Sequence, residues 1–137
     1  MSDKKIVRAK DVMKSDFAEV DGLMTVAQAM DVARQSRTRV LIVKKRDQDD
    51  EYGLVLLSDI AKQVIALDRS PERVNVYEIM AKPVIGVSTE MDVRYCARLF
   101  DNVGISLAPV MENGIVKGIV SYNDIVLDGL VAERAGG

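Results

Sequence analysis

Residues 118–125 read Gly-Ile-Val-Ser-Tyr-Asn-Asp-Ile, and residues 53–60 read Gly-Leu-Val-Leu-Leu-Ser-Asp-Ile. Both octapeptides begin with a glycine, continue with a short apolar run typical of a buried strand, and place an aspartate ahead of an amphipathic segment. Each therefore predicts a strand that turns directly into a helix. Because the two copies lie 65 positions apart in a chain of 137 residues, we expect an internal repeat.

Amphipathic segments upstream of the two octapeptides repeat as well. Each opens on a residue type that commonly caps helices, and then places apolar side chains at positions i, i+3, i+4 and i+7. This spacing predicts a helix over residues 25–33, which opens on Thr25, and another over residues 92–100, which opens on Asp92. A dipeptide of an aliphatic residue and methionine precedes each helix, as Val12-Met13 and again, 67 positions later, as Ile79-Met80.

Short strands and a final helix complete each copy. The strands predicted before the first helices are residues 18–20 and 84–87, and those predicted after them are residues 39–43 and 106–110. The loop that follows is a charge-rich segment in the first copy, over residues 44–51, where an exposed hairpin tip is expected. In the second copy the loop carries Asn113-Gly114, a strong hairpin-turn sequence. The final helices are predicted over residues 60–67 and 125–131.

The order strand, helix, strand, strand, helix in each copy predicts an α+β fold. Pro71 and its charged neighbours stop the helix between the copies, which places domain 1 at residues 1–69 and domain 2 at residues 70–137. Each copy is too small to bury its sheet alone. We therefore expect two βαββα units whose small mixed sheets pack face to face about a pseudo-twofold axis.

Composition excludes several classes of function. The 19 Lys and Arg and 21 Asp and Glu residues are interspersed, so no electrostatic footprint for nucleic acid is present. The absence of His and the single Cys96 remove the usual acid–base pairs, nucleophile–base pairs and zinc clusters, so we expect neither an enzyme nor a metal protein. No secretory or membrane-spanning stretch is evident, and a cytoplasmic location is expected.

Three features together resemble the tandem cystathionine-β-synthase-type (CBS) domain pair, or Bateman module. They are the two methionine lead-ins, the Gly-Ile-Ser-Leu-Ala-Pro-Val stretch at residues 104–110, and the Gly-x-x-Ser/Thr-x-x-Asp pattern that Gly118, Ser121 and Asp124 complete. The resemblance covers nearly the whole chain. It implies a stand-alone regulatory protein of bacterial type that forms a homodimer and binds AMP, ADP or ATP in the cleft between repeats. S-adenosylmethionine and NAD are further ligands of the family, and no catalytic cofactor is implied.

The residues themselves suggest how the second repeat would hold such a ligand. Asp124 can accept hydrogen bonds from a ribose diol, Ser121 offers a hydroxyl, and helix N-terminal amides suit a phosphate. The other interpretation is that Asp124 serves as a helix cap without any ligand. Candidate contacts from the same repeat are Gly104, Ile105, Ser106, Pro109 and Asn123, with Ile105 and Pro109 as an apolar wall for adenine. The resemblance adds Lys82, Pro83 and Val84 after the second lead-in.

The first repeat departs from the pattern. Leu56 occupies the Ser/Thr position, although Asp59 is kept, so we expect this half to hold nucleotide weakly or not at all. Arg37 and Arg39 replace Gly104 and Ser106 and are candidate phosphate contacts for the other repeat, because guanidinium geometry matches phosphate. A solvated charged edge is the alternative interpretation.

Two functions therefore remain open at this point. The first is an adenine-nucleotide sensor whose output lies in a separate effector protein. The second is a ligand-free dimerisation or scaffold module that keeps only the fold. Neither function involves nucleic acid or a membrane.

Overall fold

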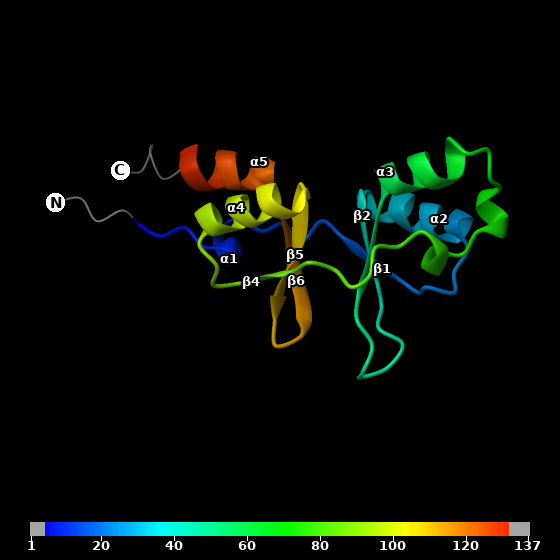
Figure 1. Cartoon of the computed structure of the whole chain (residues 1–137), viewed down its shortest axis with the longest axis horizontal. Helices are drawn as coiled ribbons and strands as arrows, with labels where there is room; N and C mark the ends of the chain where they lie inside the picture. Colours follow the sequence, from blue (N-terminus) through cyan, green and yellow to red (C-terminus); the bar gives the residue numbers. More distant parts are fainter. Residues whose placement is uncertain (1–4, 132–137) are drawn as a thin grey trace. The chain divides into compact units, whose positions relative to one another are not determined.

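The computed structural model describes residues 5–131. They form two compact units. Figure 1 shows the chain coloured by position in the sequence. Unit 2 is continuous and comprises residues 16–84. Unit 1 is discontinuous, because its described part joins residues 5–15 to residues 85–131. The compact units therefore differ from the two sequence repeats at the start of each repeat.

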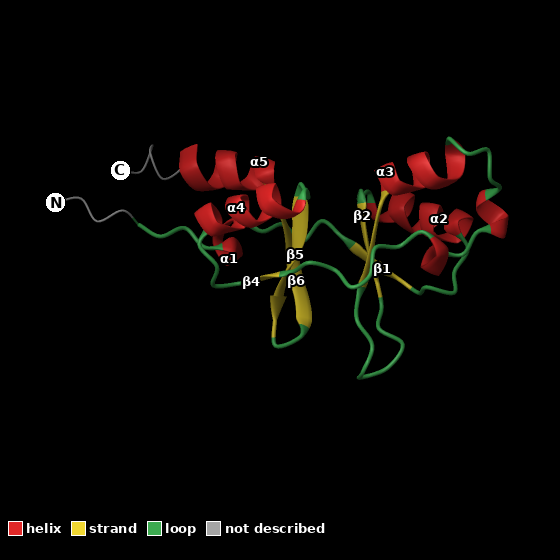
Figure 2. Ribbon diagram, viewed as in Figure 1, coloured by secondary structure: helices red, strands yellow, loops and turns green. Residues whose placement is uncertain are grey.

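Unit 2 contains a three-stranded mixed sheet with helices beside it (Figure 2). Strand β1 (Ala18–Val20) runs parallel to β2 (Val40–Val43), which pairs antiparallel with β3 (Gly53–Leu56). Helix α2 (Val26–Ser36) connects the two parallel strands, and Thr25 caps it with a hydrogen bond from the Gln28 amide. The unit continues with α3 (Leu57–Ile60), the π-helix η1 (Ala61–Ile65), and the 3-10 helices η2 (Pro71–Arg73) and η3 (Val76–Glu78).

Unit 1 repeats this topology. Strand β4 (Val87–Ser88) runs parallel to β5 (Leu107–Glu112), which pairs antiparallel with β6 (Ile115–Ser121). Helix α4 (Val93–Val103) connects the parallel strands and is capped by Asp92. The remaining helices are α1 (Ala9–Val12), α5 (Tyr122–Asp124) and the π-helix η4 (Ile125–Val131). The prediction of an α+β protein with two small mixed sheets is confirmed.

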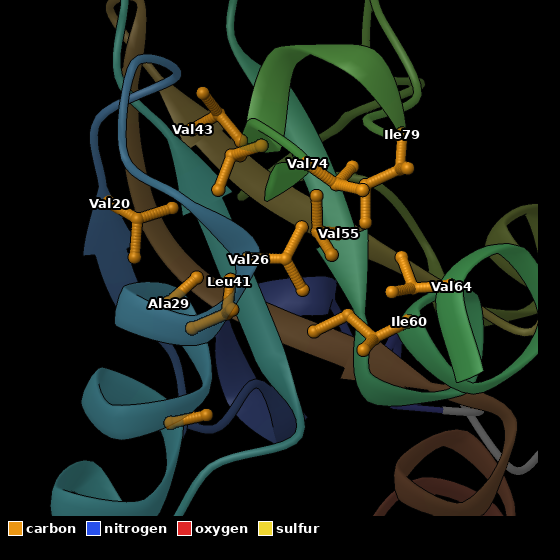
Figure 3. Close-up of a cluster of buried hydrophobic side chains, with 12 residues drawn as sticks. Val20, Val26, Ala29, Leu41, Val43, Val55, Ile60, Val64, Val74 and Ile79 are labelled. Atoms are coloured by element: carbon orange, nitrogen blue, oxygen red, sulfur yellow. The ribbon is translucent and has the colours of Figure 1, made fainter. Parts of the chain in front are cut away.

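Each unit has its own hydrophobic core. In unit 2 the buried side chains come from the sheet, from α2 and from the segment after η2, as Figure 3 shows for Val26, Leu41 and Val74. In unit 1 the core surrounds Phe100, which is fully buried. Cys96 lies in the same core, and burial raises the pKa of its thiol to about 11, so this cysteine is an inert core residue.

The start of each sequence repeat packs on the sheet of the other repeat. Lys14 and Ile119 exchange two backbone hydrogen bonds of 2.8 Å, which attaches the first lead-in to β6. Ala81 and Leu54 exchange two of 2.9 Å, which attaches the second lead-in to β3. This exchange of lead-ins explains why unit 1 is discontinuous in sequence.

The glycine that opens each octapeptide makes room for the attached lead-in. A Cβ atom on Gly118 would lie 2.9 Å from the Lys14 carbonyl oxygen and 2.9 Å from the Met13 sulfur. A Cβ atom on Gly53 would lie 2.7 Å from the Met80 sulfur. The methionine of each lead-in therefore packs against the glycine of the strand, where a larger residue would not fit.

Several predicted boundaries were wrong. The strand expected over residues 84–87 is confined to β4, and the final helices begin at Leu57 and Tyr122, earlier than residues 60 and 125. The Asn113-Gly114 turn is confirmed, with φ values of 52° and 76° that glycine and asparagine tolerate best. Across residues 5–131, no helix has the length and apolar character needed to cross a bilayer.

Candidate ligand-binding site

Ser121 and Asp124 face each other at the junction of β6 and α5. The Asp124 Oδ2 atom accepts hydrogen bonds from the Ser121 amide at 2.9 Å and from the Ser121 hydroxyl at 2.9 Å. The Asp124 amide donates to the Ser121 hydroxyl oxygen at 3.2 Å. Ser121 is therefore the helix cap and Asp124 the third helical residue, which corrects the interpretation of Asp124 as the cap.

This arrangement fixes one carboxylate oxygen of Asp124 and leaves the other available. Within residues 5–131, the hydrogen bonds to this carboxylate go to Oδ2, so Oδ1 has no protein donor. Both side chains are half-buried. A charged acceptor held in one rotamer is suited to a hydroxyl donor from outside the protein, because hydrogen bonds to ionised groups are about twice as strong as neutral ones.

The loop from α4 to β5 lies beside this junction. The Tyr122 amide donates to the Ser106 carbonyl oxygen at 3.1 Å, which holds the start of β5 against the start of α5. Gly104 ends α4 in the left-handed conformation with φ 74°, and its place is exposed. Glycine is the residue that adopts this conformation most easily, whereas the sequence suggested that Gly104 allows close approach to a ligand.

The other predicted residues of the second repeat lie in different environments. Asn123 is exposed on the first turn of α5. Pro109 is buried in β5, and Ile105 is partly buried against the unit 1 core. Ile105 therefore contributes to packing within unit 1.

The equivalent junction in unit 2 keeps half of this arrangement. Asp59 Oδ2 accepts a hydrogen bond from the Leu56 amide at 2.8 Å, but Leu56 has no hydroxyl to complete the pair. The Leu57 amide donates to the Arg39 carbonyl oxygen at 3.1 Å, in the manner of Tyr122 and Ser106. The two junctions thus share a backbone design and differ in side-chain chemistry.

Arg37 occupies the position equivalent to Gly104 and has the same left-handed conformation, with φ 53°. A side chain in this conformation is disfavoured by contact between its Cβ and the backbone. Arg37→Gly is therefore expected to raise the free energy of unfolding by about 0.5 to 1 kcal/mol, after the larger entropy of glycine in the unfolded chain is included. Urea denaturation followed by circular dichroism measures this change.

Arg39→Gly is the matched control for this prediction. It makes the same chemical change two positions later, where φ is not positive. This variant is expected to lose stability, because glycine is disfavoured in extended segments. Equal effects of the two substitutions would contradict the role assigned to the Arg37 backbone.

Among residues 5–131, no group of three or more Cys, Asp and Glu side chains is placed to hold a metal ion. The site features are therefore a hydroxyl, a carboxylate and backbone groups at a strand–helix junction, repeated with changes in the other unit. The CBS domain family model matches residues 9–66 and 76–128. The chain belongs to the CBS domain family.

Solved structures of other CBS proteins share this fold. A hexameric CBS-CP12 protein from bloom-forming cyanobacteria is 36% identical, with a TM-score of 0.87 over 94% of this chain and 75% of that one. A CBS domain protein from Pyrobaculum aerophilum complexed with AMP is 17% identical, with a TM-score of 0.77 over 94% and 99% of the two chains. The CBS domain pair of protein MJ0100, in complex with 5′-methylthioadenosine and S-adenosyl-L-methionine, is 24% identical, with a TM-score of 0.72 over 95% and 99%.

Two uncharacterised relatives, from Methanopyrus kandleri and Thermofilum pendens, are longer than the CBS pair. They are 29% and 25% identical over 72% and 88% of this chain. The chain spans 52% and 43% of their lengths. The match therefore concerns the CBS pair and not the whole of these proteins.

The remaining predicted residues belong to the CBS fold of unit 2. Lys82, Pro83 and Val84 follow the lead-in attached to β3, and Arg37 and Arg39 lie at the end of α2 and before β2. All five belong to unit 2, whereas Ser121 and Asp124 belong to unit 1. The exchange of lead-ins is the reason why Lys82, Pro83 and Val84 belong to unit 2, and it has no signature in the repeat pattern.

Sequence reasoning missed a contact that involves one of these residues. Asp50, in the loop expected to be an exposed tip, has a side chain that is only 7% exposed and pairs with the Lys82 ammonium at 2.6 Å. Its carboxylate also accepts a hydrogen bond from the Arg46 amide. The hydrogen bond from Lys82 is the main cause that holds the pKa of Asp50 well below its usual range. The abundance of acidic residues in this loop gave no signal that Asp50 differs from its neighbours.

Proposed function

We propose that this CBS domain pair is a regulatory module that binds an adenosine-containing nucleotide and signals to a separate partner protein. The observation that carries this proposal is the Asp124 carboxylate, held by Ser121 through one oxygen and open at the other. Family membership supports the same conclusion, because two solved CBS proteins are in complex with ligands that contain an adenine base and a ribose.

The chemistry of the junction fits a ribose. A ribose offers two adjacent hydroxyl donors, and Asp124 Oδ1 is an ionised acceptor without a protein partner among the described residues. Asn123 is exposed one residue before Asp124 and adds an amide that can both donate and accept. Recognition of the sugar leaves the rest of the ligand to other contacts, for which Gly104, Ile105, Ser106 and Pro109 remain proposed residues.

Two proteins with this fold support an adenosine ligand. One is complexed with AMP, and the other with 5′-methylthioadenosine and S-adenosyl-L-methionine. An adenine base on a ribose ring with free 2′- and 3′-hydroxyls is the part that all three ligands share. We therefore infer that AMP, ADP or ATP, or a related adenosyl compound such as S-adenosylmethionine or NAD, is the ligand of this chain.

The remaining parts of the proposal concern the protein's role. The proposal includes ligand contacts from five further residues: Lys82, Pro83, Val84, Arg37 and Arg39. It also includes the domain limits 1–69 and 70–137. We further propose that the protein forms a homodimer, is cytoplasmic and has no enzymatic activity. A regulatory output requires that the ligand bind two states of the protein with different affinity.

Calorimetric titration with AMP, ADP, ATP and S-adenosylmethionine tests the proposal on the wild type and on Asp124→Ala. We expect Asp124→Ala to weaken binding at least tenfold, because it removes hydrogen bonds to a charged acceptor worth roughly 1.5 to 3 kcal/mol each. Asp59→Ala is the matched control, since it changes the same motif position in unit 2, where Leu56 replaces the serine. This control is expected to leave the affinity unchanged.

Three results would contradict parts of this proposal. Equal binding by Asp124→Ala and the wild type would remove Asp124 from the site. A stoichiometry of two ligands per chain would show that the first repeat also binds. The absence of binding by any of the four compounds would favour the ligand-free scaffold. The hydrogen bonds between Ser121 and Asp124, which cap the helix without a ligand, and the hexameric 36%-identical relative also support that function.

A further inference from the structure

The exchange of lead-ins brings a lysine to the Asp124 junction that the repeat pattern did not select. Lys14 pairs through its backbone with Ile119, two residues before Ser121 on β6. The bridge fixes the start of the Lys14 side chain beside the strand that leads into α5. Lys14 and Asp124 are distant in sequence but belong to the same compact unit.

The Lys14 ammonium lies among carboxylates of the final helix. It forms an ion pair with Asp128, one helical turn after Asp124 on the same face. The hydrogen bond from Lys14 to Asp128 raises the pKa of Lys14, and the charge of Asp124 contributes in the same direction. The ammonium is therefore within electrostatic range of the carboxylate proposed to bind ribose.

This ion pair can be exchanged at little cost. The side chains of Lys14 and Asp128 are 53% and 45% exposed. Exposed ion pairs contribute little to stability, because water solvates both charges well. A lysine with a flexible four-carbon stem can leave one exposed anion for another, and phosphate is a common partner for its point charge.

Of the three charged residues Lys14, Asp124 and Asp128, unit 2 keeps an equivalent only for Asp124, which is Asp59. Ala81 occupies the position of Lys14 in the bridge to β3, and Gln63 lies one turn after Asp59. Lys14 and its ion-pair partner Asp128 thus accompany the junction that has both serine and aspartate. The junction of unit 2, which lacks the serine, has no equivalent of either residue. This difference connects Lys14 to ligand binding more closely than to the fold, which both units build.

We propose that Lys14 is a specificity-determining residue of the Asp124 site. Its ammonium leaves the ion pair with Asp128 and pairs with the phosphate of the ligand. This inference rests on the proposed function for the position of the ribose at Asp124. It assigns the preference for a phosphorylated adenosine over adenosine itself to one side chain. Asp128 holds the ammonium near the site when no phosphate is present.

Parallel titrations with AMP and with adenosine test this role, because the two ligands differ only in the phosphate. We expect Lys14→Gln to weaken AMP binding about tenfold and to leave adenosine binding unchanged. Asp128→Asn removes the competing anion, so AMP is expected to bind a few times more tightly and adenosine equally well. Lys117→Gln is the control, since Lys117 is another exposed lysine of the same unit, on β6.

The outcomes separate the two proposals. One outcome is that adenosine binding depends on Asp124, and that Lys14→Gln changes the affinities for AMP and adenosine equally. This outcome would overturn the role of Lys14 and keep the proposed function. The same effect of Lys117→Gln and Lys14→Gln on AMP would reduce Lys14 to a contribution to net charge, and would also overturn it. Failure of both ligands to bind the wild type would overturn the proposed function and the role of Lys14 with it.

Discussion

Phe100→Ala is expected to lower the free energy of unfolding by about 3 to 5 kcal/mol, the range for truncation of a buried aromatic side chain. Phe100 is fully buried at the centre of the unit 1 core. Its ring also packs edge-on against Tyr122, with centroids 5.4 Å apart and planes at 77°. The substitution therefore removes apolar contacts, leaves a cavity, and loosens the residue that follows Ser121. Urea denaturation followed by circular dichroism measures the loss.

Tyr95→Ala is the control for this prediction. Tyr95 lies on the same helix, but its side chain is 58% exposed and contacts the Arg98 guanidinium through its ring, 5.3 Å from the centroid. Loss of an exposed aromatic is expected to change stability by about 0.5 kcal/mol or less. A loss of similar size for both variants would show that α4 does not pack as described.

Gly118→Ala is expected to destabilise unit 1 by about 2 to 3 kcal/mol, near the upper end of the usual cost of overpacking. The added Cβ would lie 2.9 Å from the Lys14 carbonyl oxygen, which accepts a hydrogen bond from the Ile119 amide, while the Lys14 amide donates to the Ile119 carbonyl oxygen. The backbone can make room only if this bridge breaks. Chemical denaturation measures the loss, and Asp124-dependent ligand binding is expected to weaken with it.

Gly53→Ala is the matched variant in unit 2 and is expected to cost less. The closest atom to its added Cβ is the Met80 sulfur, at 2.7 Å, which belongs to a flexible side chain. Methionine adapts its rotamer more readily than a backbone carbonyl moves. The contact at 3.1 Å with the Val43 side chain limits this relief. A larger loss for Gly53→Ala than for Gly118→Ala would contradict this explanation.

Local sequence signals predicted the elements of the fold well. The caps at Thr25 and Asp92 predicted the starts of α2 and α4, because capping depends on a few neighbouring residues. Short continuous apolar runs predicted the strands around Leu41 and Val120. The final helices begin earlier than predicted because Leu57 and Tyr122 are apolar residues that continue the strand pattern, although the chain already turns there.

Features that depend on distant contacts could not be predicted in this way. Both final helices widen into π-helices, η1 and η4, and no local pattern indicates this change. Nor could the repeat pattern show which sheet a lead-in joins, since either sheet offers a glycine to its methionine. That choice places Lys82 in unit 2 and places Lys14 in unit 1, the unit of the Asp124 junction. The pairing of Asp50 with Lys82 depends on the same choice.

The sequence indicated which residues meet at the β6–α5 junction, but not the geometry of their contact. Ser121 and Asp124 were selected together, and the structure shows them in direct contact. The sequence did not indicate that Ser121 is the helix cap and Asp124 the third helical residue. An aspartate before a helix and an aspartate inside its first turn look alike in sequence. Gly104 was selected for a different reason from the one its φ of 74° provides.

The exchange of lead-ins also sets the order in which the two units can be completed during synthesis. Unit 2 is continuous, so it can fold once residue 84 has left the ribosome. The segment around α1 must wait, because the Arg8 side chain donates to the Glu90 carbonyl oxygen, 82 positions later in the chain. Contacts so distant in sequence slow folding. Residues 5–15, although they are made before unit 2, are thus among the last of the described residues to reach their native place.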